Sequence, residues 1–345
     1  MIRYSKCSHS GTRLAIDSHG RPVPANQRTI PFQGDLALKT STLTKLFSTA
    51  AVVGALAAPA LSQEEGITLP GASAEVTLDY VSQYFFRGYE QFESDQGIVL
   101  QPGASLTIPV VDGVTATVGT WMSIHSDVDA GGTNNPSSFY EADIYGSLDA
   151  EVGDFALSVS MTHFNYPAIA GSVDVLELGL GASYDDSEIL GDFAINPYIY
   201  VGIEVNNTNT NNVDSNGNGD EAMYLELGGA FSLNSLTEGT FAEVWDWSVP
   251  FAFGLSLDDY YTDASGAEEF LGYISIGLAG SVPMSELIGT DEYFGAWDLS
   301  VGVTLLLLNS DVSAGAGNGF GQVDNADDTG DNFQFIASVG ISREW

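Results

Sequence analysis

Apolar and polar residues alternate over segments of about 10 residues along most of the chain, and this pattern restricts the fold more than any other feature. In the clearest segment, residues 296–307, Trp297, Leu299 and Val301 begin a run in which every second residue is large and apolar. The residues between them are mostly small or polar. Since alternate side chains of a β-strand point to opposite faces, the segment predicts a strand with one hydrocarbon face and one polar face.

Twelve segments share this alternation. They are residues 75–87, 98–110, 114–125, 140–151, 155–165, 175–184, 196–205, 223–231, 248–257, 270–282, 296–307 and 333–345. An even strand number is the rule for single-chain bacterial outer-membrane barrels. The sequence therefore predicts an all-β fold, a transmembrane antiparallel up-and-down β-barrel of about 12 strands.

The connections between these segments alternate in length. Residues 111–113 and 153–154 are tight turns, whereas the stretches 127–138, 206–220, 258–269 and 309–332 are long and rich in Asn, Gly and Asp. Short periplasmic turns opposite long external loops are typical of such barrels. Residues 232–247 and 283–295 break the pattern on the short side, and the second stretch predicts a helical turn.

The polar faces of several strands carry acids. A soluble β-sandwich would also alternate, but closing the strands with their apolar face towards lipid leaves a polar, acidic lumen. The predicted lining carboxylates are Asp79, Glu141, Asp143, Glu177, Glu204 and Glu226. Rings of carboxylates favour cations over anions in channels, so we expect cation preference.

Basic residues are scarce and unevenly placed. The chain has 46 acidic residues against 9 basic ones and a formal charge of −37, and only Arg87 and Arg343 follow Lys45 among the basic residues. This balance excludes nucleic acid as a partner, because such binding relies on Lys and Arg to displace phosphate counterions.

The N-terminal part has the composition of an export signal. Residues 38–62 contain Lys39 and Lys45, then an apolar core too short to span a bilayer, then small residues, which predicts a secretory signal peptide. Residues 1–37 are predicted to be an upstream, mis-started segment, and residues 63–345 the barrel domain. The single cysteine, Cys7, lies before the signal, so no disulfide framework is expected.

The last segment and the aromatic residues point to the outer membrane of a Gram-negative cell. Residues 333–345 form an amphipathic strand that ends in Trp345, a feature favoured by the barrel assembly machinery. Aromatic residues near the predicted strand ends suggest interfacial girdles, among them Tyr80, Tyr84, Tyr140, Tyr200, Tyr260 and Tyr261. The expected partners are outer-membrane lipid, this machinery, and small solutes or cations.

Several motifs resemble the TorF family of porins. They are LDYVSQYFFRGYEQ from residue 78, GTWMS from 119, YEADIYGSL from 140, HFNYP from 163 and VLELGLGASY from 175, and they span residues 78 to about 205. The family's compact YVFRG is stretched here to YVSQYFFRG, and the external loops are larger. The resemblance implies porin-like membrane placement rather than a named substrate.

Arg87 is the strongest candidate for a functional residue. Strand parity places it on the face of Asp79 and Gln83, at the outer end of the acidic lumen. One hypothesis is that its bidentate fork pairs with Glu141 or Asp143 and shapes a constriction. The alternative is a structural salt bridge that holds the first strand and its loop.

Residues 214–221 resemble the opening of a calcium loop, with alternating oxygen ligands. Position 12 of an EF-hand would be Leu225 instead of Glu, which rejects that motif. A weaker calcium site is predicted from Asp214, Asn216, Asn218, Asp220 and Glu221; the alternative is an ordinary Asn-rich external loop.

Catalytic groups are few. After the predicted signal peptide the chain has two histidines, His125 directed inward and His163 outward, and it has no Lys, no Cys and no G-x-S-x-G motif. We therefore expect no enzyme and no cofactor, but a porin-like channel for small hydrophilic solutes. A barrel with hydrolase activity and a non-conducting calcium-binding surface protein are the alternatives.

Overall fold

The computed structural model describes most of the predicted barrel. The described residues are 15–16, 22–23, 71–92, 97–126, 139–167, 173–206, 222–263, 266–288, 297–312 and 332–345. The predicted signal peptide lies outside them, as do the five predicted calcium ligands. Of residues 1–37, only β1 (Ala15–Ile16) and β2 (Pro22–Val23) are described, as a two-stranded pair.

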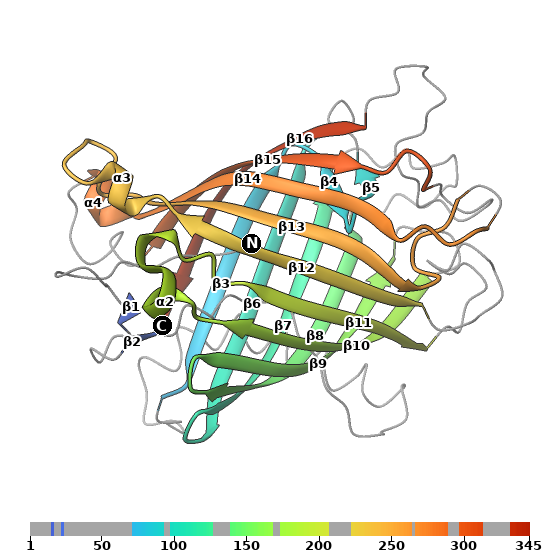
Figure 1. Ribbon diagram of the computed structural model, residues 1–345, viewed down its shortest axis with the longest axis horizontal. Coiled ribbons are helices and arrows are strands. Elements are labelled where there is room, and N and C mark those ends of the chain that lie inside the picture. Colours follow the sequence, from blue (N-terminus) through green and yellow to red (C-terminus); the bar gives the residue numbers. More distant parts are fainter. Residues whose placement is uncertain are drawn as a thin grey trace.

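Twelve strands close into one antiparallel barrel, which confirms the predicted fold class (Figure 1). They are β3 (Ser73–Val81), β6 (Val99–Val111), β7 (Val114–His125), β8 (Phe139–Val152), β9 (Phe155–Tyr166), β10 (Val173–Tyr184), β11 (Tyr198–Asn206), β12 (Met223–Ser232), β13 (Asp246–Asp258), β14 (Leu271–Pro283), β15 (Trp297–Leu308) and β16 (Phe333–Glu344). Each strand pairs with its neighbours in the chain, as in an up-and-down barrel. Closure leaves no unpaired sheet edge.

The seam lies between the last strand and the first. β16 pairs with β3 in a register that sets Gly340 opposite Asp79. Ala74 and Trp345 extend the seam through two backbone hydrogen bonds of 3.2 and 2.9 Å. The terminal aromatic segment thus completes the barrel.

The segment 75–87 is not one strand, and here the sequence-based prediction was wrong. β3 ends at Val81, and a small separate hairpin follows, made of β4 (Tyr84–Phe86) and β5 (Tyr89–Phe92). This hairpin pairs only with itself and belongs to neither neighbouring barrel strand. We call residues 84–92 the lumen hairpin, because its side chains contact the inward faces of strands on both sides of the barrel.

The two ends of the barrel differ. One end carries the tight turns and three short helices, α2 (Ser187–Leu190), α3 (Asn234–Thr237) and α4 (Met284–Ile288), with η2 (Gly191–Phe193) beside α2. α4 confirms the helical turn expected after residue 283. The lumen hairpin lies at the opposite end (Figure 1). No helix in the described part of the chain is long and apolar enough to cross a membrane.

Burial alternates along the strands as the sequence pattern requires. In β9 and β16, exposed positions alternate with less exposed ones. The exposed large side chains come from strands around the barrel and include Leu78, Leu100, Leu148, Val159, Leu180, Ile199, Leu227, Phe253, Ile276, Val303 and Phe335. A closed sheet with an apolar exterior and a polar interior fits a lipid environment.

Candidate functional site

The lumen hairpin turns at Arg87 and Gly88. Both residues have positive φ, 50° and 84°, as a two-residue type I′ turn requires. Glycine adopts this conformation freely, but a left-handed Arg costs about 1–2 kcal/mol. Contacts made by the Arg87 side chain must therefore offset local strain.

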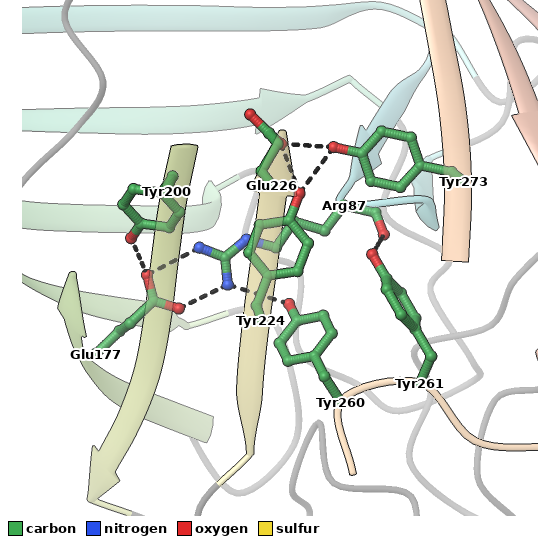
Figure 2. Close-up of polar contacts among 8 residues, drawn as sticks. All are labelled: Arg87, Glu177, Tyr200, Tyr224, Glu226, Tyr260, Tyr261 and Tyr273. Carbon is green, nitrogen blue, oxygen red and sulfur yellow. Dashed lines mark hydrogen bonds and ion pairs between the residues drawn. The ribbon is translucent and has the colours of Figure 1, made fainter. Parts of the chain in front are cut away.

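Arg87 reaches the far side of the lumen. In the closed strand order, β3 and β10 are separated by β6, β7, β8 and β9 in one direction and by six strands in the other. Even so, the Arg87 guanidinium pairs with Glu177 on β10, with Nη1–Oε2 and Nη2–Oε1 distances of 2.6 and 2.8 Å (Figure 2). Two parallel charge-assisted bonds fix both position and orientation.

Three tyrosines complete the surroundings of this guanidinium. The Tyr260 hydroxyl lies 3.2 Å from Nη1, and the Tyr224 ring centroid lies 4.1 Å from Cζ. The Tyr200 ring is 5.6 Å away, and its hydroxyl donates to Glu177 at 2.5 Å. Tyr261 donates to the Arg87 carbonyl at 2.8 Å, so the turn itself is held as well (Figure 2).

The strand register places two carboxylates next to each other at this site. Glu177 and Glu204 are direct cross-strand partners on β10 and β11, and both are buried. Like charges placed opposite each other destabilise a sheet. Burial lowers the pKa of Arg87, but the charge and hydrogen bonds of Glu177 together with the neighbouring Tyr260 and Tyr200 outweigh it, so the pKa lies well above its usual range and the turn remains cationic.

Tyrosine hydroxyls also satisfy Glu226 on β12. Tyr224 and Tyr273 both donate to its Oε2, at 2.5 and 2.6 Å, and Tyr198 donates to its Oε1 at 2.7 Å. Glycines make room for these side chains: a Cβ on Gly254 would lie 2.1 Å from a ring carbon of Tyr273. The prediction that Tyr84, Tyr140 and Tyr200 belong to interfacial girdles was wrong, because all three are buried inside the barrel. Tyr80, exposed on β3, fits a girdle.

The other wall of the lumen holds Glu141 and Asp143 on β8. Tyr84 of the hairpin donates to Glu141 Oε2 at 2.7 Å. Glu141 Oε1 and Asp143 Oδ1 are buried and have no hydrogen-bond partner in the described part of the chain. The predicted pairing of Arg87 with these two acids was wrong: its partner is Glu177.

The remaining predicted lining residues also lie on inward faces. Asp79 on β3 is buried against Gly340, and Glu204 is buried on β11. All six predicted carboxylates thus belong to the inner surface, although most of them are buried. Among the described residues, no group of three or more His, Cys, Asp or Glu is arranged to hold a metal ion.

The two histidines take the predicted directions. His125 is buried, 3.0 Å from the Ser123 hydroxyl, and its ring stacks on Tyr140 at a centroid distance of 4.5 Å. Ser123 is equally buried, so this Ser–His pair offers a substrate no access in the present conformation. His163 lies on the outside and pairs with Asp174 at 3.2 Å.

The tyrosines around Arg87 are the functional candidates that sequence reasoning missed. Tyr260 and Tyr261 follow β13 and were predicted only as girdle residues. The available signal was composition: the polar face of β12 and the segments beside it combine tyrosines with acids, as in Tyr224 and Glu226. A tyrosine next to a lumen carboxylate can act as its hydrogen-bond donor.

Comparisons with known proteins give similar barrels only. The NanC porin aligns with a TM-score of 0.43 and 9% identity over 78% of this chain and 98% of that chain. The COG4313 outer membrane channel from Pseudomonas putida F1 gives 0.43 and 12% over 82% and 100%, and the translocator domain of the autotransporter NalP from Neisseria meningitidis gives 0.38 and 10% over 89% and 99%. Because these TM-scores and identities are low, the comparisons add nothing to what the strand order of the barrel already shows.

No protein-family model and no curated protein matches the sequence. The resemblance to the TorF family is therefore not confirmed and stays a prediction.

Proposed function

We propose that the chain is an outer-membrane channel that passes small hydrophilic solutes and prefers cations. The observation that carries this proposal is the charge of the inner surface. Six carboxylates lie on inward faces, while Arg87 is the one basic side chain inside the described barrel. Arg343 instead lies at the end of β16 with its guanidinium 4.8 Å from the Trp345 ring.

The excess of carboxylates over basic side chains on the inner surface determines which solutes the channel selects. Carboxylates along a lumen with low-dielectric walls lower the local potential and raise the concentration of cations. Salt screens such a field, with a Debye length of about 10 Å at 0.1 M. Cation preference should therefore weaken as ionic strength rises.

Conduction should be small, because the lumen hairpin joins the two walls. Its Tyr84 bonds Glu141 on β8, and its Arg87 bonds Glu177 on β10. A barrel of 12 strands also stands between the filled barrels of about 8 strands and the open porins of 16–18. We therefore expect the hairpin to limit passage through the lumen.

Single-channel recording tests the proposal. Protein refolded in detergent is inserted into planar bilayers, and the reversal potential is measured across a tenfold KCl gradient. The expected result is a small conductance with a reversal potential of the sign set by K⁺. Anion preference, or no conductance from protein whose heat-modifiable gel migration shows a folded barrel, would overturn it.

A matched pair of variants links the current to the hairpin. Arg87→Ala removes the contact with β10 and should raise conductance. Arg343→Ala, which removes the other basic residue after residue 45, should leave it unchanged. Equal currents in both variants and the wild type would show that the hairpin does not limit passage.

A further inference from the structure

The far wall of the lumen forms a socket for a guanidinium group. We define the guanidinium socket as Glu177, Tyr200, Tyr224 and Tyr260. Both oxygens of the Glu177 carboxylate accept hydrogen bonds from the bound guanidinium. The centroid of the Tyr224 ring lies 4.1 Å from the guanidinium carbon, and the Tyr260 hydroxyl lies 3.2 Å from one guanidinium nitrogen. The occupant, Arg87, comes from a separate hairpin and not from the wall itself.

The shape of the socket selects one class of cation. A carboxylate that accepts two parallel N–H bonds matches the planar fork of a guanidinium, whereas a compact ammonium acts as a point charge. Aromatic faces add attraction for weakly hydrated organic cations. A metal ion such as Ca²⁺ would require six to eight oxygen ligands, which the socket does not supply.

The socket is held in place by contacts that do not involve Arg87. Tyr200 bonds Glu177, while Tyr224 is fixed by Glu226 and by Tyr273, whose hydroxyl is 2.8 Å from its own. Three of its four members stand on barrel strands β10, β11 and β12. Removing the Arg87 side chain would therefore leave a preformed anionic cavity lined by tyrosines.

The neighbourhood stays anionic when the occupant is absent. Glu204 lies directly opposite Glu177 in the strand register. Without Arg87, these two buried carboxylates still lie directly opposite each other on β10 and β11. Both burial and like-charge repulsion then favour uptake of a cation.

We propose that this socket is a binding site for solutes that carry a guanidinium group, with Arg87 as a tethered competitor for the same site. The strained turn at Arg87 limits how strongly the tethered group competes. A solute that takes its place frees the hairpin from β10. The inference rests on the proposed channel function only for the route by which the solute arrives.

Calorimetric titration in detergent tests binding without conduction. Arg87→Ala is titrated with methylguanidinium, and methylammonium and KCl at equal ionic strength serve as comparison cations. We expect methylguanidinium to bind the variant at least tenfold more tightly than the wild type, and at least tenfold more tightly than methylammonium binds. Glu177→Gln in the Arg87→Ala background should abolish this gain.

The matched control is Asp112→Asn in the same background, because Asp112 is exposed in the tight turn between β6 and β7, outside the lumen; binding should be unchanged. If methylguanidinium binds the Arg87→Ala variant no better than the wild type, or if Glu177→Gln has no effect, the inference is wrong. Arg87→Gln is measured in the same way if Arg87→Ala fails to fold, as judged by gel migration. Its outcomes carry the same meaning.

The two proposals fail separately. Loss of the binding signal in a protein that still conducts rejects the socket and keeps the channel. Binding that depends on Glu177 in a protein that never conducts keeps the socket and rejects the channel.

Discussion

The two walls of the lumen carry similar carboxylates but treat them differently. On the wall of β10 and β12, Glu177 and Glu226 accept hydrogen bonds on both oxygens, from Arg87 and from tyrosines. On the wall of β8, Glu141 and Asp143 each keep one buried oxygen without a partner in the described residues. The lumen hairpin touches both walls, yet it brings its one positive charge to the first.

This difference shows which acids the arginine of the described lumen pairs with. Glu177 faces Glu204 directly across the register, so charge repulsion is most direct there. Glu141 and Asp143 stand two positions apart on the same strand, about 7 Å along its axis. Neutralising one acid should therefore have opposite consequences on the two walls.

The largest effect is expected from Glu177→Gln. The change leaves the buried Arg87 guanidinium without its counter-charge, and breaking a buried ion pair in this way costs about 3–5 kcal/mol. Arg87 and Glu177 side chains are only 10% and 1% exposed, so solvent gives little relief. Urea unfolding in lipid vesicles, followed by tryptophan fluorescence, measures the loss.

Two further variants check the reason for this loss. Glu226→Gln, on the same wall, faces only neutral hydroxyls and should cost less, about 1–3 kcal/mol. The double change Arg87→Ala with Glu177→Gln should recover much of the stability, because it removes both charges of the ion pair together. Equal losses of unfolding free energy for Glu177→Gln and Glu226→Gln would show that the ion pair between Arg87 and Glu177 does not cause the larger loss.

A second prediction concerns the space that holds Tyr261. A Cβ on Gly272 would lie 2.1 Å from the Tyr261 ring, so Gly272→Ala must displace the side chain that bonds the Arg87 carbonyl. Overpacking of this kind costs about 1–3 kcal/mol. Gly146→Ala on β8 is the control, since its Cβ would come no closer than 3.4 Å to any neighbour. A similar loss in both variants would contradict the packing explanation.

The strands were predictable because their pattern is local. Lipid outside and polar groups inside force a period of two on each strand, and the alternation in 114–125 coincides with β7. The lumen hairpin was missed because Asp79 and Arg87 share parity, which suggested one continuous strand. The signals against it were three consecutive aromatics from Tyr84 and the Arg87-Gly88 pair, which suits a two-residue turn.

The partner of Arg87 could not be read from the sequence for a different reason. Parity places Glu141, Asp143 and Glu177 on the inner surface but says nothing about their height or their position around the barrel. Those coordinates depend on strand order, stagger and closure, which are set by the whole sheet. The candidate carboxylates were therefore predictable as a set, while the ion pair and its tyrosines were not.

A smaller effect is expected from Tyr261→Phe. The change keeps the ring beside Gly272 and removes only the hydroxyl that donates to the Arg87 carbonyl. One such hydrogen bond contributes about 0.5–1.5 kcal/mol. The unfolding midpoint should fall accordingly, and the reversal potential should stay constant because no charge changes. A shifted reversal potential would mean that this hydroxyl acts on the ions themselves.

The smallest effect, with the opposite sign, is expected from Asp143→Asn on the second wall. The Asn oxygen can still accept the backbone N–H of Asn165 that Asp143 binds. The new amide can donate towards Glu141, whose Oε1 has no partner in the described residues. Removing a buried charge that has no counter-ion among the described residues should leave stability unchanged or raise it by up to about 1 kcal/mol.

The comparison with Glu177→Gln makes this last outcome decisive. Both changes replace one buried lumen carboxylate by its amide, so volume and hydrogen-bonding shape are nearly matched, but only Glu177 is paired with Arg87. A loss for Asp143→Asn as large as that for Glu177→Gln would require a cationic partner for β8 from outside the described residues. Opposite signs in the same unfolding assay would assign the stability difference to Arg87.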